Sequence, residues 1–144
     1  MTRKTVAVRR EEIVVAALDQ VRARGIAGVR AADVAKALGD PGITARVILV
    51  GEELVGTISC FPMDGQDHVG YWIDRAYWGM GIASHALHLL LREVAKRPLV
   101  AAAATSNGAS LRVLQKCGFV VERVHLSPAR DRFPECEESI LLLR

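Results

Sequence analysis

The spacing of apolar residues changes along this 144-residue chain at the Gly-Asp-Pro-Gly sequence of residues 39–42. Upstream, apolar residues recur at helical spacing, which predicts an amphipathic helix over residues 9–24 and a shorter helix over residues 31–38. Downstream, residues 44–50 and 54–61 are rich in Val, Ile, Leu and Thr with a spacing of two, which predicts a β-hairpin. The two spacings together exclude an all-helical and an all-β fold.

The rest of the chain alternates between strand and helix patterns. In chain order, the predicted elements are a strand over residues 68–73, a helix after the glycines at 79 and 81 that runs to about residue 96, a strand over 99–105, a helix over 107–116, and strands over 119–124 and 139–143. A hairpin followed by strand–helix–strand crossovers predicts an α/β fold of the α+β type, in which helices flank a mixed, partly antiparallel sheet. We divide the chain into a helical N-terminal segment, residues 1–40, packed on the core, and a main unit, residues 41–144.

Size and composition restrict the class of protein further. A mass of 15.6 kDa favours one compact domain. A content of 51% hydrophobic and 24% charged residues excludes global disorder. No run approaches the roughly 20 apolar residues of a membrane-spanning helix, and residues 1–12 lack the apolar region of a signal peptide. We expect a soluble, cytoplasmic protein with no membrane partner.

Charge and cysteine content exclude some partners and leave others open. The net charge of +3 lies entirely in residues 1–40, which hold eight Lys and Arg against five Asp and Glu. Such an excess fits either a nucleic-acid footprint or a solvated helical face, and its small size does not favour nucleic acid. Cys60, Cys117 and Cys136 are an odd number without a Cys-x-x-Cys pair, so we expect reduced thiols rather than disulfides or a zinc site.

The most informative local pattern is the glycine pair that follows the predicted strand at residues 68–73. Gly79 and Gly81 let a ligand approach the backbone closely, and the helix that follows offers unpaired N–H groups and a positive dipole end. This combination predicts an anion site, with phosphate as its natural occupant. The Rossmann and P-loop patterns do not fit, because the third glycine and the Gly-Lys-Ser/Thr sequence are missing.

A second motif lies downstream of the glycine pair and makes the pattern more specific. Asn107-Gly-Ala-Ser110 opens a predicted helix that ends in Lys116-Cys-Gly-Phe119. With the glycine loop before it, this pair of motifs resembles the GCN5-related N-acetyltransferase (GNAT) superfamily over about residues 44–143. The sequence Gly-Tyr-Trp-Ile at 70–73, followed by residues 77–83, is most similar to the branch of ribosomal-protein N-terminal acetyltransferases. The resemblance implies the acyl-CoA N-acyltransferase fold.

The resemblance also implies acetyl-CoA as acetyl donor, a primary amine as acceptor, which is a protein N-terminus or a small amine, and no metal. The amine would attack the thioester directly, so catalysis would rest on positioning and on hydrogen bonds. It implies a pantetheine arm beside Trp72 and Ile73 with a contact from Asn107. The pyrophosphate would contact the following residues: Trp78, Gly79, Met80, Gly81, Ile82, Ala83 and Ser84.

The sequence departs from the family pattern at two positions. Trp78 stands where an Arg or Gln usually begins the loop, and Leu114 stands where many members have a Tyr that serves as general acid. The resemblance suggests Ser110 as the substitute acid, and the alternative is that Ser110 only bonds the backbone of its helix. No general base is identifiable among the three candidates His68, Asp74 and Glu122. The pair His85 and His88 has metal-ligand spacing but no third ligand.

The first 40 residues carry a second resemblance. Residues 9–39 are similar to the start of a tetracycline-repressor-type helix-turn-helix, but a strand follows where the recognition helix should come. We favour the reading that this segment replaces the first strand, at residues 5–8, and the first two helices of an acetyltransferase. The alternative functions are a transcriptional regulator and a degenerate acyl-CoA-binding protein, and a homodimer stays open.

Overall fold

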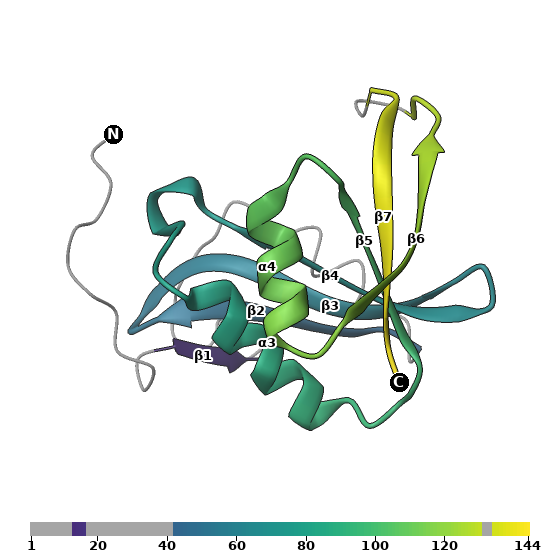
Figure 1. Cartoon of the computed structure of the whole chain (residues 1–144). Helices are drawn as coiled ribbons and strands as arrows, with labels where there is room; N and C mark the ends of the chain where they lie inside the picture. Colours follow the sequence, from purple (N-terminus) through teal and green to yellow (C-terminus); the bar gives the residue numbers. More distant parts are fainter. Residues whose placement is uncertain (1–12, 17–41, 131–133) are drawn as a thin grey trace.

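The computed structural model describes residues 42–130 and 134–144, together with the backbone of residues 13–16. In chain order the elements are β1 (Ile13–Ala16), β2 (Thr44–Val50), β3 (Glu53–Met63), β4 (Gln66–Ile73), the 3-10 helix η2 (Arg75–Tyr77), α3 (Ile82–Glu93), β5 (Leu99–Ala104), α4 (Gly108–Lys116), β6 (Val120–Ser127) and β7 (Cys136–Leu143). The described strands form one seven-stranded sheet in the order β1-β2-β3-β4-β5-β7-β6 (Figure 1). Neighbouring strands are antiparallel except for β4 and β5, which are parallel. The predicted mixed, partly antiparallel sheet with flanking helices is therefore confirmed.

The predicted elements after residue 42 are all present, with shifts at their ends. Strand β2 has the predicted bounds, whereas β3 and β4 pair as far as Met63 and Gln66. They extend because Asp64 and Gly65 both take positive φ angles, of 52° and 76°, and so form a two-residue hairpin turn. Helix α3 ends at Glu93, three residues before the predicted end, because Val94 already has an extended backbone.

The N-terminal segment corrects a prediction. Residues 13–16, expected inside a helix, form β1, which pairs antiparallel with β2 from Ile13↔Val50 to Ala16↔Val47. The sequence here is Ile-Val-Val-Ala, and β-branched residues lose side-chain freedom in a helix but fit a pleated sheet. The helix predicted over residues 9–24 is therefore wrong at this stretch. The helix over 31–38 and the strand over 5–8 lie outside the described residues.

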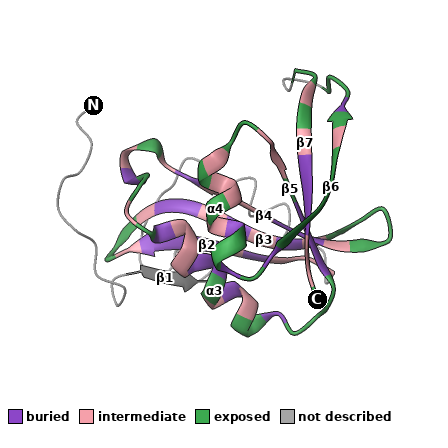
Figure 2. Ribbon diagram, in the orientation of Figure 1, coloured by how far each residue is buried: buried purple, intermediate pink, exposed green. Residues whose placement is uncertain are grey.

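Helices α3 and α4 pack on the same face of the sheet and enclose the main apolar core (Figure 1). Leu87 and Leu90 of α3 and Leu114 of α4 are buried against strand residues such as Ile58 and Leu141. Figure 2 shows the same arrangement, with buried segments in the middle of the sheet and in part of α3. The core thus fixes both helices against the sheet.

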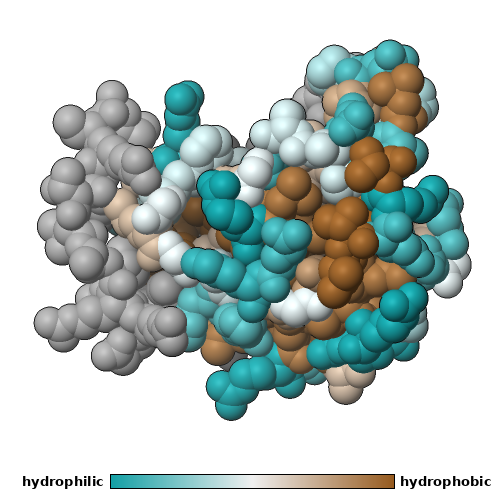
Figure 3. Space-filling model, in the orientation of Figure 1, coloured by the Kyte–Doolittle hydropathy of each residue, from teal (hydrophilic) through white to brown (hydrophobic). Residues whose placement is uncertain are grey.

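The edge strand β6 is far less covered than the middle of the sheet. Val124 and Leu126 are 50% and 64% exposed, and Figure 3 shows apolar surface along this hairpin. The hairpin stays ordered through its partner strand, because β6 pairs with β7 from Val120↔Leu142 to Ser127↔Cys136. No helix among the described residues is long and apolar enough to cross a membrane.

The feature that positions the site is the divergence of the two parallel strands. Strands β4 and β5 pair only at Asp67↔Leu99 and His68↔Val100, near the start of each strand. Beyond these pairs β5 turns away to pair with β7 along its full length (Figure 1). The later part of β4, up to Ile73, therefore has an edge that no described strand occupies.

Candidate acyl-donor site

A cavity of about 460 Å³ lies along the end of β4, beyond the last residues that pair with β5. Its walls are the end of β4, the glycine loop with the start of α3, and one side of α4. All of the predicted site residues except Met80 line it, namely Trp72, Ile73, Trp78, Gly79, Gly81, Ile82, Ala83, Ser84, Asn107 and Ser110. Two motifs separated by more than 20 residues in the sequence thus share one cavity.

The glycine loop leaves the start of α3 open. Gly79 and Gly81 have φ angles of 74° and 75°, a left-handed conformation that favours glycine. Gly81 is the N-cap of α3, and it carries no side chain that could bond the first N–H groups of the helix. The first intrahelical bond runs from His85 N to Gly81 O at 3.2 Å. The N–H groups of the first turn therefore offer an anion site at the cavity wall.

Helix α4 begins differently. Asn107 is its N-cap, and the Asn107 Oδ1 atom accepts a hydrogen bond from the Ser110 N–H at 3.2 Å. Leu111 N donates to Asn107 O at 3.2 Å, which closes the first turn of the helix. This start is thus closed by its own residues, and the cap fixes the backbone of Ser110 beside the cavity.

The Ser110 side chain meets a residue from the opposite wall. Tyr71 of β4 donates its phenol O–H to Ser110 Oγ at 3.2 Å. Burial raises the pKa of the Tyr71 phenol, so this group stays protonated and able to donate at neutral pH. The Ser110 hydroxyl therefore accepts a hydrogen bond from another side chain, whereas its backbone N–H takes part in the helix cap.

The edge of β4 that faces the cavity carries backbone groups that no described strand pairs with, and Trp78 of the glycine loop bonds one of them. Asp74 N donates to Val55 O at 2.7 Å, and peptide groups alternate in direction along a strand. The peptide of Trp72 therefore points to β3, and those of Tyr71 and Ile73 point to the cavity. Trp78, which is 55% exposed, donates its indole Nε1–H to Ile73 O at 2.8 Å.

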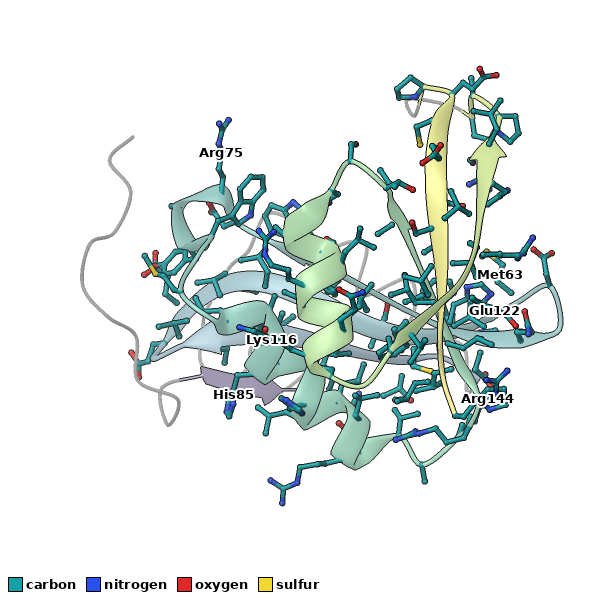
Figure 4. All side chains as sticks on the ribbon, in the orientation of Figure 1. Met63, Arg75, His85, Lys116, Glu122 and Arg144 are labelled. Carbon is teal, nitrogen blue, oxygen red and sulfur yellow. The ribbon has the colours of Figure 1, made fainter. Side chains whose placement is uncertain are left out.

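Charge in the cavity wall comes from cations. Arg112 and Lys116 line the cavity from α4, and no residue in the described lining is acidic. Figure 4 shows Lys116 on α4 near α3, whereas Arg75 extends away from the molecule. Together with the positive dipole end of α3, these two side chains make the site attractive to phosphate groups.

Six further residues line the cavity and are not among the predicted site residues: Tyr71, Tyr77, Ala109, Arg112, Val113 and Lys116. The four members on α4 recur at helical spacing from Ala109, so a helical projection of residues 107–116 would have found them. Tyr71 precedes Trp72, and strand alternation sends its side chain to the other face of β4 from that of Trp72. Both side chains nevertheless line the cavity.

The three candidates for a general base lie outside the cavity lining. His68 is buried, with its ring stacked on Phe61 at a centroid distance of 5.9 Å. The Asp74 carboxylate caps η2 by accepting from Ala76 N at 3.0 Å. Glu122 is exposed on β6, away from α3 (Figure 4). Among the described residues there is no group of three or more His, Cys, Asp or Glu that could hold a metal ion.

Comparison with known proteins shows the family to which this chain belongs. The family model described as an acetyltransferase (GNAT) domain matches residues 12–120. A curated relative, the ribosomal-protein-serine acetyltransferase of Escherichia coli strain K12, is 32% identical over 83 residues, which are 53% of this chain and 46% of that protein. This chain therefore spans less than half the length of that relative.

Solved structures agree on the fold. RimL, a ribosomal α-N-protein acetyltransferase in complex with coenzyme A, has a TM-score of 0.75 at 16% identity and covers 96% of each chain. The microcin self-immunity acetyltransferase MccE, in complex with acetyl-CoA and AMP, has a TM-score of 0.73 at 16% identity and covers 97% of each chain. The chain belongs to the GNAT acetyltransferase family. The matched range includes most of the segment that resembles a helix-turn-helix.

Proposed function

We propose that this protein transfers an acetyl group from acetyl-CoA to a primary amine. The observation that carries the proposal is the cavity beside the end of β4, with the open N-terminus of α3 and two cations in its wall. A pyrophosphate has the charge and size for the first turn of α3, where the amides of residues 78–83 and the Ser84 hydroxyl would bond it. Arg112 and Lys116 would neutralise its remaining charge.

The other end of the donor would follow β4. Pantetheine carries amide groups, and the peptide groups of Tyr71 and Ile73 face the cavity, where no described strand lies beside them. The Trp72 side chain lines the same wall. Asn107 would contact pantetheine through its amide NH2 group, because its Oδ1 atom already caps α4. This arrangement brings the thioester near Ser110.

The reaction we propose needs no covalent enzyme intermediate. The amine lone pair forms a bond to the thioester carbonyl carbon, and the C–S bond then breaks with its electron pair left on sulfur. Ser110 gives its proton to that sulfur, and the proton released from the attacking nitrogen returns to Ser110 through solvent. Because no carboxylate or imidazole lines the described cavity, the chain's own contribution is the positioning of both reactants.

We propose a protein N-terminus as the acceptor. The names of the relatives and the pKa of α-amino groups support this acceptor class. The names of the E. coli relative and of RimL both specify acetylation of ribosomal proteins. A neutral amine is required, and α-amino groups have a pKa of about 7.7–8.0 against about 10.4 for lysine. An α-amino acceptor should therefore give a kcat/KM that rises with pH and levels off near pH 8. A lysine or small alkylamine acceptor would keep rising to about pH 10.

The proposal is tested by an acceptor screen that measures release of the coenzyme A thiol. Peptides with free N-termini, the same peptides blocked at the N-terminus, and small amines are compared at equal concentration. Turnover with free N-termini alone supports the proposed acceptor class, and turnover with small amines alone replaces it. Acetyl-CoA binding without turnover on any amine would make the chain a degenerate acyl-CoA-binding protein and would overturn the enzymatic proposal.

We also propose that residues 1–40 belong to the same structural unit as residues 41–144. Strand β1 pairs with β2, whose Val47 and Leu49 are fully buried. Removal of residues 1–40 would expose the edge of β2, so we expect an insoluble or non-cooperatively melting fragment. A soluble fragment of residues 41–144 that melts cooperatively and binds acetyl-CoA would instead show that the N-terminal segment is a separate module.

A further inference from the structure

Two hydroxyl groups in the cavity wall, one from β4 and one from α4, form a hydrogen bond with each other. Tyr71 is on β4 and Ser110 is in the first turn of α4, 39 residues later, and the Tyr71 hydroxyl donates to Ser110 Oγ at 3.2 Å. Both residues line the cavity. The proposed reaction uses the Ser110 hydroxyl alone and leaves Tyr71 without a role.

Both partners are held by the fold before any ligand binds. Tyr71 pairs with Ile58 in the sheet, and its side chain packs against the apolar core. Ser110 is held by the hydrogen bond from its N–H to Asn107 Oδ1. The contact is therefore preorganised by β4 on one side and by the capped helix on the other.

The direction of this hydrogen bond determines where the serine proton can go. A serine hydroxyl has one proton and two lone pairs. The Tyr71 proton occupies one lone pair of Ser110 Oγ, so the Ser110 proton cannot point back at the tyrosine oxygen. The remaining directions include the cavity. A phenol is also a better donor than an alkyl hydroxyl, which favours this direction over the reverse.

We propose that Tyr71 is a positioning residue that holds the Ser110 O–H bond toward the sulfur of the acyl donor. This inference rests on the proposed function, since it assigns a task within the same reaction. Tyr71 exchanges no proton in the step. It keeps its own proton, and its hydrogen bond strengthens Ser110 as a donor by polarising the serine hydroxyl. The departing thiolate then meets an O–H group that is already oriented.

The first test measures the thiol of bound coenzyme A without any turnover. The ultraviolet absorbance of the thiolate is followed against pH for coenzyme A bound to the wild type, Tyr71→Phe, Ser110→Ala and the double variant. A hydrogen bond from Ser110 stabilises the thiolate, so the bound thiol should have a lower pKa than free coenzyme A. Each single variant should raise that pKa by roughly half a unit to one unit, and the double variant should raise it no further than Ser110→Ala does.

The second test is the matching kinetic cycle with the amine found by the acceptor screen. Tyr71→Phe should lower kcat roughly three- to tenfold in the wild type, with KM for acetyl-CoA changed less than about twofold. It should have no effect in the Ser110→Ala background, because the group that it orients is then absent. In a Ser110→Thr background, which keeps the hydroxyl, the loss caused by Tyr71→Phe should return.

A matched control comes from a second pair of hydroxyls. Thr105 Oγ1 and Ser139 Oγ lie 2.8 Å apart outside the cavity lining, so Ser139→Ala removes a comparable hydrogen bond elsewhere. It should change neither the bound thiol pKa nor kcat. Coenzyme A that does not bind to the wild type overturns the proposed function together with this inference. If bound coenzyme A has the same thiol pKa in the wild type and in Tyr71→Phe, the inference alone is overturned. It is also overturned if the losses of kcat caused by Tyr71→Phe and Ser110→Ala multiply in the double variant.

Discussion

The two helices that border the cavity begin in opposite ways. Helix α3 starts from Gly81, a left-handed residue with no side chain, so the first N–H groups receive no cap from that position. Helix α4 starts from Asn107, whose side chain bonds the N–H of Ser110. Every helix has unsatisfied N–H groups at its start, and a capping side chain takes up one of them. A start without a cap suits a bound anion, whereas a capped start fixes the side chains of its first turn.

This difference assigns separate tasks to the two sides of the cavity. The open start of α3 suits the phosphates of the donor, and the closed start of α4 holds Ser110 against Tyr71. A change at Gly81 should therefore affect donor binding, and a change at Ser110 should affect turnover. The assignment would be contradicted if a change at Gly81 affected only turnover and a change at Ser110 affected only donor binding.

The largest effect is expected from Gly81→Glu, which places a carboxylate at the open start of α3. That carboxylate would interact favourably with the helix dipole and repel the pyrophosphate from the same N–H groups. At a ligand concentration of about 100 times Kd, the wild type should gain about 2.7 kcal/mol from acetyl-CoA, and the variant should gain nothing measurable. The measurement is the melting temperature with and without acetyl-CoA.

Gly81→Ala is the matched control for this change. A Cβ atom at Gly81 would meet nothing within 4 Å, so alanine adds only the strain of a positive φ angle of 75°. That strain costs roughly 1–2 kcal/mol of stability and leaves the N–H groups in place. The alanine variant should melt earlier and still respond to acetyl-CoA. Equal responses of the glutamate variant and the wild type would show that the phosphates bind elsewhere.

Ser110→Ala should have the next largest effect, confined to turnover. Loss of a proton donor that acts on the leaving group should lower kcat roughly ten- to a hundredfold. The melting shift with acetyl-CoA should stay close to that of the wild type, because Ser110 lies at the closed helix start. Steady-state kinetics and thermal melts on the same preparation separate the two readouts. An unchanged kcat would leave Ser110 as a residue that only stabilises the helix start.

The two sides of the cavity also differ in how far the sequence predicts them. Gly79, Gly81, Asn107 and Ser110 belong to local motifs, because a helix start is determined by residues adjacent in the chain. The partner of Ser110 could not be found in this way. Tyr71 and Ser110 are 39 residues apart in the chain, so their contact depends on the tertiary fold and has no local sequence signal.

Strand β1 is a second feature that local sequence does not predict. A short apolar run such as Ile-Val-Val-Ala fits helical and strand spacing equally well. Its conformation is decided by pairing with β2, about 34 residues further along the chain. Strand β2, in contrast, has the predicted bounds, since the hairpin with Gly51 at its end is a local feature.

A third variant, Asn107→Ala, tests whether the closed start of α4 depends on its cap. Removal of an N-cap side chain costs typically about 1 kcal/mol, within a range of roughly 0.5–2. The melting temperature should fall by about 2–4 °C, and kcat should fall as well because the Ser110 backbone loses its anchor. Asn107→Ser, which keeps a capping oxygen, should recover most of the stability. A full recovery of stability with no recovery of kcat would show that the asparagine acts on the ligand rather than on the helix.

The smallest effect is expected from Trp78→Phe, in the loop that leads to α3. This change removes the indole N–H bond to Ile73 O and keeps an aromatic ring over the loop. Because Trp78 is about half exposed, the lost hydrogen bond should cost only about 0.5–1 kcal/mol, and Kd for acetyl-CoA should rise less than about fivefold. Titration of acetyl-CoA by calorimetry measures the change against Gly81→Glu under the same conditions. If Trp78→Phe weakens binding as strongly as Gly81→Glu, the indole itself contacts the donor, and the open start of α3 does not bind the phosphates by backbone groups alone.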